Sequence, residues 1–90
     1  MMKTESAQER WLDCQVDEGM FSDEMAVSYP PEGEVIQSVF VPASVVRGVP
    51  GEKGKVRVHV MNRLGKTFAV LPSSERAIVP VAERDLTESP

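Results

Sequence analysis

Apolar and polar residues alternate along several short segments of this chain of 90 residues. In residues 12–17, Leu12, Cys14 and Val16 alternate with polar residues, and in residues 55–60 three valines alternate with three basic residues. Successive side chains of a β-strand point to opposite faces, so a period of two predicts strands with one buried face. The sequence therefore predicts an all-β fold.

Proline and glycine interrupt the alternation between segments of this kind. Pro42 has no backbone N–H to give to a ladder, so it ends a strand or lies at a sheet edge. Short turns are expected at residues 43–46 and 83–86. Six strands are predicted, at residues 12–17, 24–29, 36–41, 55–60, 68–71 and 77–81.

The order of these segments occurs twice. Residues 14–16 align with 58–60, residues 25–27 with 68–70, residues 29–30 with 71–72, and residues 39–42 with 77–80. The spacing differs because the first copy has longer turns, which loops tolerate. Shared Ala-Val and Val-Pro dipeptides favour a duplication, and chance similarity between two β-meanders is the alternative.

A three-strand meander leaves one apolar face uncovered and two open edges, and two copies facing each other cover both. We therefore expect a small six-strand barrel of two meander repeats with approximate two-fold symmetry. The second copy, with Ala77-Ile78-Val79-Pro80-Val81 followed by a short turn, resembles the closing strand and turn of SH3-like barrels. That resemblance implies an interaction module, since SH3-like barrels commonly bind peptides, nucleic acids or larger assemblies.

One domain is expected at this length. The predicted boundaries are a flexible tail at residues 1–10, a first repeat at 11–47, a Gly/Pro-rich connection at 48–54, a second repeat at 55–86 and a short tail at 87–90. So small a core is marginal without a staple or a partner, which makes a homodimer a reasonable expectation.

The single cysteine, Cys14, has no intramolecular disulfide partner, and no apolar run has the length of a signal peptide or a membrane span. A reducing cytoplasm suits this composition, and no membrane association is expected.

The net charge of −4 conceals a division along the chain. Residues 1–46 carry nine acids against two bases, whereas residues 47–66 carry six bases against one acid. The basic stretch predicts an alternative function in binding nucleic acid or the ribosome. Pairing with the acidic half across neighbouring strands is the competing interpretation, and no interleaved aromatic residue supports base stacking. The candidate anion-binding residues are Arg47, Lys53, Lys55, Arg57, His59, Arg63 and Lys66.

The residue types needed for catalysis are sparse. Cys14 and His59 are the only cysteine–histidine pair, but Cys14 alternates with the buried set and His59 with the exposed set. Cys14 is therefore predicted to fill the core. One cysteine and one histidine do not supply a four-ligand metal site, so no metal, cofactor or small-molecule substrate is expected, and an enzyme is disfavoured.

Apolar residues stand at the predicted hairpin tips. Met20 and Phe21 occupy the first tip and Leu64 the second, while Trp11 is out of phase with the buried strand residues. Such residues either fold over the barrel ends or anchor a protein interface. The leading prediction is a non-catalytic protein-binding module, or an accessory or regulatory subunit, that binds its partner through Trp11, Met20, Phe21 and Leu64.

Overall fold

The computed structural model describes residues 8–90 and contains eight strands and two 3₁₀-helices there. Residues 1–7, which make up most of the predicted N-terminal tail, fall outside the described part. The elements are β1 (Gln8–Glu18), β2 (Glu24–Tyr29), β3 (Gln37–Pro42), η1 (Ala43–Val45), β4 (Val46–Arg47), β5 (Lys53–Arg63), β6 (Lys66–Val70), β7 (Ile78–Pro80), η2 (Glu83–Asp85) and β8 (Leu86–Thr87).

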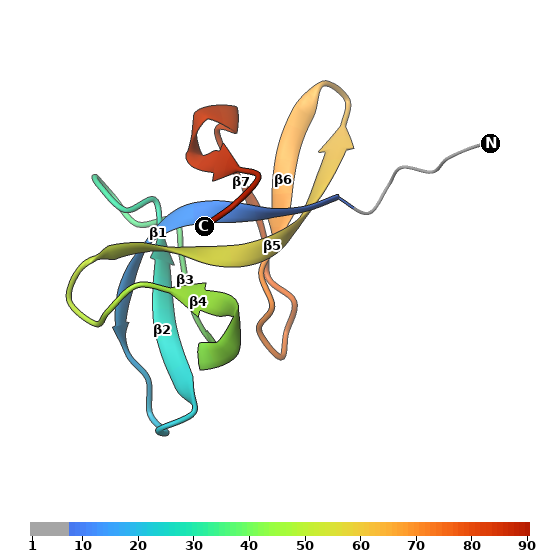
Figure 1. The fold of residues 1–90 in the computed structure, drawn as a ribbon. Helices are drawn as coiled ribbons and strands as arrows, with labels where there is room; N and C mark the ends of the chain where they lie inside the picture. Colours follow the sequence, from blue (N-terminus) through green and yellow to red (C-terminus); the bar gives the residue numbers. More distant parts are fainter. Residues whose placement is uncertain (1–7) are drawn as a thin grey trace.

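The six longer strands form one antiparallel sheet in the order β3-β2-β1-β5-β6-β7 (Figure 1). The sheet curls into a small, nearly closed barrel, and residues 8–90 contain no α-helix. The short strands lie beside the central pair, β4 against β5 and β8 against β1. The predicted all-β, six-strand barrel is thus confirmed.

Apolar side chains from every strand, mostly valine, fill the barrel, as the alternation predicts. The inward-facing residues of β1 and β5 are buried, and Asp13 and Arg57 between them point outward. Burying one such side chain stabilises a fold by about 1.5–3 kcal/mol. The buried core consists of Leu12, Cys14, Val16, Val27, Tyr29, Val39, Val41, Val46, Val56, Val58, Val60, Ala69, Leu71, Val79 and Leu86.

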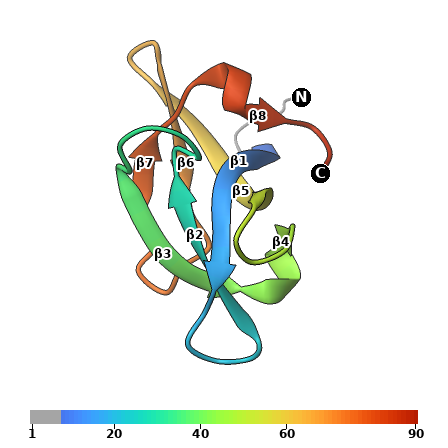
Figure 2. The same cartoon turned by 90° about the vertical axis from the view of Figure 1, so that its left-hand side faces the viewer.

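A local two-fold axis relates the two central strands, β1 and β5. Leu12 on β1 lies opposite Val56 on β5. Val46 of β4 then pairs with Val56, while Leu86 of β8 pairs with Leu12. Each half therefore places its last strand beside the first strand of the other half, and the same order of elements is visible twice in Figure 2.

The strand register gives a different alignment of the two halves from the sequence similarity. Val27 lies opposite Val16, and Ala69 lies opposite Val60. Val27 therefore corresponds in position to Ala69, one residue away from its match in the sequence alignment.

In the edge strands β3 and β7 the structural alignment of the two halves is shifted by two residues from the sequence alignment. Val39 and Val79 are the partners of Val27 and Ala69. Pro42 and Ala82 are the extended residues that precede the two 3₁₀-helices, so Pro42 corresponds in position to Ala82 rather than to Pro80. Because alternation accepts valine at any inward position, sequence similarity alone does not set this register. The duplication itself stays a prediction.

Strand boundaries extend beyond the alternating residues. β1 begins at Gln8 and β5 at Lys53, because the two strands pair along their length from Gln8–Val60 to Gln15–Lys53. Residues 8–10 of the predicted tail and residues 53–54 of the predicted connection are therefore strand residues. Gly54 permits the close approach of β4, since a Cβ built on it would lie 2.4 Å from the Arg47 carbonyl oxygen.

The two predicted turns at residues 43–46 and 83–86 are confirmed as a 3₁₀-helix followed by the start of a short strand. Tyr29 fixes the second turn from the other half of the chain. Its hydroxyl donates to Asp85 Oδ2 at 2.6 Å and accepts from the Ala82 N–H at 3.1 Å. Burial and the bond to the Asp85 carboxylate raise the pKa of Tyr29.

Pro42 is the last residue of β3, and Pro80 is the last residue of β7. These strands end the sheet, and within residues 8–90 each pairs with a single neighbour. The prediction that Pro42 ends a strand at an edge is confirmed. Over the same residues the model contains no helix long and apolar enough to cross a membrane.

Candidate functional site

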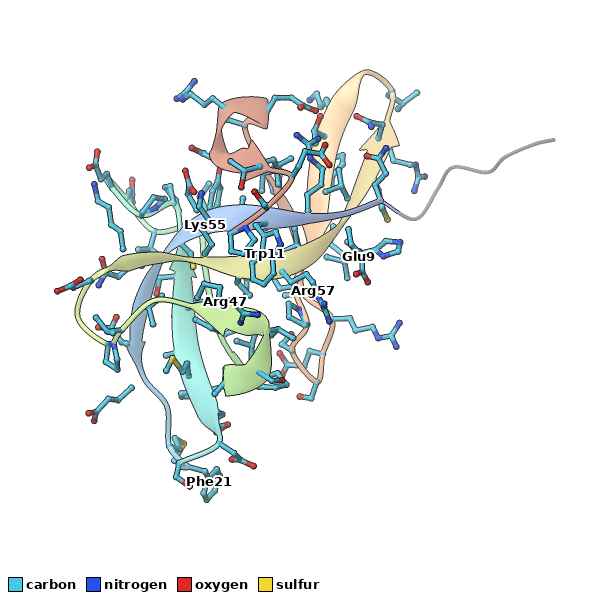
Figure 3. The ribbon with its side chains drawn as sticks, in the orientation of Figure 1. Glu9, Trp11, Phe21, Arg47, Lys55 and Arg57 are labelled. Atoms are coloured by element: carbon cyan, nitrogen blue, oxygen red, sulfur yellow. The ribbon has the colours of Figure 1, made fainter. Side chains whose placement is uncertain are left out.

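The four residues predicted to bind a protein do not come together. Met20 and Phe21 are 72% and 68% exposed at the tip of the β1–β2 hairpin, and Leu64 is 99% exposed at the tip of β5–β6. The two tips lie at opposite ends of the molecule (Figure 1). Trp11 is only 9% exposed. Figure 3 shows Phe21 at the hairpin tip, well away from Trp11.

Trp11 lies on the outer face of the sheet beneath β4. The Arg47 guanidinium carbon is 5.0 Å from the centre of its ring, and Figure 3 labels both residues near the middle of the molecule. The same guanidinium donates to the Val46 carbonyl oxygen at 3.1 Å. A cation over an indole face is a favourable contact. The Trp11 indole is therefore largely covered within the fold, whereas the Arg47 side chain that contacts it is exposed.

Met20 and Phe21 face a depression that also receives Phe40 of the edge strand β3. We call it the apolar pocket. The sequence reasoning did not single out Phe40, although its position between the inward-facing Val39 and Val41 marks it as an outward-facing aromatic residue. The lining residues are Met20, Phe21, Asp23, Glu24, Phe40, Val41, Pro42, Pro72, Ser73 and Ser74.

A second, separate apolar surface surrounds Leu64. Met61, Phe68 and Ile78 line it together with the stems of two basic residues. Leu64 has a positive φ of 55°, as hairpin-tip residues often do, and Gly65 follows it with a φ of 79°.

The basic strand is largely paired with carboxylates. Lys55 lies opposite Asp13 and makes an ion pair with it at 2.5 Å. Arg57 lies 3.7 Å from Glu9, and Lys53 pairs with Glu32 and lowers the pKa of that carboxyl. Cross-strand charge pairing, one of the two sequence interpretations, is confirmed for Lys55 and Arg57.

The remaining candidate anion-binding residues are dispersed. His59 projects outward from the middle of β5, whereas Arg63 and Lys66 face each other across the β5–β6 hairpin. The structure therefore does not assemble the seven predicted residues into one basic surface.

Two depressions flank the β1–β5 pair. The compensated pocket, about 450 Å³, is lined by Asp13, Pro31, Glu32, Lys53, Gly54, Lys55 and Asp85. The cationic pocket, about 480 Å³, is lined by Glu9, Val45, Arg57, Val58, His59, Val70, Leu71, Pro72, Ser73 and Arg76. The two-fold relation of the strands places Asp13 in the position of Arg57, and Lys53 in the position of Glu9.

Cys14 lies in the core, 1% exposed, as predicted. Burial raises the pKa of its thiol from 9.0 to about 12, and the neighbouring Asp13 carboxylate adds to the shift. Since the thiolate is the nucleophilic form, this environment suppresses cysteine chemistry at neutral pH. Residues 8–90 contain no cluster of three or more metal-ligating side chains.

Comparison with known proteins found no matching family model and no significant match to a curated protein or a solved structure. The fold and its surface therefore define the chain by architecture: a small, nearly closed antiparallel β-barrel with two charged depressions and a separate apolar pocket.

Proposed function

We propose that this protein is a non-catalytic module that binds an extended segment of another protein, with an apolar side chain of that segment in the apolar pocket. The observation that carries the proposal is the exposure of Met20, Phe21 and Phe40 around one depression. Large aromatic and methionine side chains are the types that anchor protein interfaces.

The rim of the apolar pocket favours a partner different from the protein itself. Asp23 and Glu24 line it beside Phe21. In a symmetric dimer through this surface each patch meets its own copy, so these carboxylates would approach those of the second chain. A homodimer formed elsewhere on the molecule is compatible with the proposal.

The partner is expected to be an extended segment because the pocket lies at the open edge strand β3. Exposed edges are common docking sites for extended peptides. The resemblance of the second half to SH3-like barrels supports the same class of function at the level of fold alone. A reducing compartment such as the cytoplasm suits a module with a single buried thiol.

Binding to nucleic acid or the ribosome is less well supported. Lys53 and Lys55 already lie beside carboxylates, so a phosphate backbone would compete with existing ion pairs at these two residues.

Peptide selection against the whole protein tests the proposal. Displayed random peptides enriched on it should share an apolar residue, and Phe21→Ser or Phe40→Ser should weaken their binding at least tenfold, since truncated anchors cost about 2 kcal/mol or more. Leu64→Ser is the matched control, because it removes an exposed apolar residue from the other hairpin tip. No enrichment, or an equal loss in Leu64→Ser, would refute the proposal.

A further inference from the structure

The cationic pocket differs from its counterpart in charge. In the compensated pocket three carboxylates face two lysines, and both lysines are paired. In the cationic pocket Arg57, Arg76 and His59 face a single carboxylate, that of Glu9. Within residues 8–90 its single ion pair joins Arg57 to Glu9 at 3.7 Å, and both side chains are at least half exposed. An exposed pair this long is weak, so a better anion readily displaces Glu9.

The hydrogen-bond donors of the cationic pocket come from two separate elements. Arg57 and His59 project from β5, and Ser73 and Arg76 come from the loop between β6 and β7. The Ser73 hydroxyl oxygen accepts from the Ala77 N–H at 3.3 Å, which leaves its O–H free to donate. Donors carried by different elements suit a tetrahedral oxyanion better than a planar carboxylate, which a single arginine fork can hold.

Arg76 is held in an unusual backbone conformation. Its φ is 54°, in the left-handed region that disfavours residues with a Cβ. The loop fixes this geometry, since the Arg76 N–H donates to the Ser73 carbonyl at 3.0 Å and the Leu71 N–H donates to the Ala77 carbonyl at 2.8 Å. Glycine or asparagine would fill such a position at lower cost. Strain of this kind is found where a side chain has a use.

We propose that the cationic pocket binds the phosphoryl group of a phosphorylated peptide segment, through the guanidinium groups of Arg57 and Arg76 with the His59 ring N–H and the Ser73 hydroxyl. The phosphoryl oxygens accept these hydrogen bonds and displace Glu9 from Arg57. Arginine forks are well matched to phosphoryl oxygens.

The apolar pocket lies next to this site. Pro72 and Ser73 line both depressions, so one extended segment reaches both. The inference rests on the proposed function in this respect: the phosphoryl group belongs to the same segment whose apolar side chain occupies the apolar pocket. A residue spacing of two along an extended chain spans ~7 Å, which suits neighbouring depressions.

NMR titration of the whole protein tests the phosphoryl site. Inorganic phosphate should shift the amide signals of residues 57–59 and 73–77 and leave those of residues 53–55 unshifted. Arg57→Gln and Arg76→Gln should raise the Kd at least fivefold, and Glu9→Gln should lower it. Lys53→Gln in the compensated pocket is the matched control and should not change the Kd. Equal shifts at both pockets, or unchanged affinity in both arginine variants, would overturn the inference.

Three further probes identify the ligand class: a pentapeptide with leucine two residues before phosphoserine, its serine counterpart, and a single-stranded oligonucleotide of equal charge. The phosphopeptide should bind at least tenfold more tightly than the other two. Tighter binding of the oligonucleotide would overturn the assignment to a peptide.

The same peptide separates this inference from the proposed function. If Arg76→Gln weakens phosphopeptide binding and Phe21→Ser does not, the proposed apolar anchor is wrong and the phosphoryl site stands. If Phe21→Ser weakens binding and the arginine variants do not, the proposed function stands and the phosphoryl site is wrong.

Discussion

The compensated and cationic pockets occupy corresponding positions beside β1 and β5, yet they differ in what their charges do. In the compensated pocket Asp13 and Lys55 hold the two central strands together. In the cationic pocket Arg57 occupies the position that corresponds to Asp13, and it has only a long contact with Glu9. One framework thus carries a short, half-buried ion pair on one side and a long, exposed one on the other.

The buried faces of the two halves also differ at one position, where Cys14 of β1 corresponds to Val58 of β5. The pKa of the Cys14 thiol is about 12 in the fold, against 9.0 as a free side chain. The unfolded chain therefore loses this proton first. Stability should be complete below pH 9 and fall as the pH rises toward 12, by an amount on the order of 4 kcal/mol for a full shift of this size.

Cys14→Val makes the two halves alike at this position and should remove most of the alkaline loss. Urea unfolding between pH 8 and 12 gives the comparison. The raised pKa of Tyr29 acts in the same direction, with loss beginning near its usual value of 10, so a smaller alkaline loss should persist in the variant. Parallel curves for both proteins would contradict the role assigned to Cys14.

Removing one acid from each pocket should have unequal effects on stability. Asp13→Asn leaves the half-buried Lys55 ammonium without its partner and should cost about 1 kcal/mol of unfolding free energy. Glu9→Gln should change it by less than about 0.5 kcal/mol, since both members of that pair are exposed. Chemical denaturation of the two variants at neutral pH and low salt measures both values. Equal losses would mean that the pockets do not differ in this respect.

The smallest expected effect concerns the two non-glycine residues with positive φ, Arg76 and Leu64. Substitution by glycine relieves a cost of about 1–2 kcal/mol in the fold and adds entropy to the unfolded chain, so each variant should gain about 0.5 kcal/mol. Only Arg76→Gly should also weaken phosphate binding. Thermal unfolding and phosphate titration of both variants check this, and a stabilised Arg76→Gly that binds phosphate normally would contradict the ligand role.

The sequence was a good guide to the fold because alternation and proline turns report directly on strands. The inward set of β1 and β5, the edge position of Pro42 and both short turns followed from it. The register of the strands did not follow from it. The Val-Pro dipeptides of β3 and β7 match in sequence although they pair at different positions along their strands.

The candidate site was less accessible to sequence reasoning. Trp11 is out of phase with the core, as predicted, but Arg47 of β4 covers it, and that contact depends on a strand pairing distant in sequence. Arg76 and Phe40 reach their pockets through loop closure and barrel curvature, which no local pattern records. Residues predicted as a site because they are apolar and exposed therefore lie far apart. The pockets are lined by residues that no common sequence pattern links.

The pairing of Leu86 with Leu12 has a consequence for how the protein forms. The first strand receives β8 as a neighbour only after nearly all of the described chain has been synthesised, and its other central partner, β5, also comes late. Contacts so distant in sequence slow folding. Only the end of β1, from Gln15 to Glu18, has a local partner, in β2, so the rest of the strand waits for β5 before it pairs in the sheet.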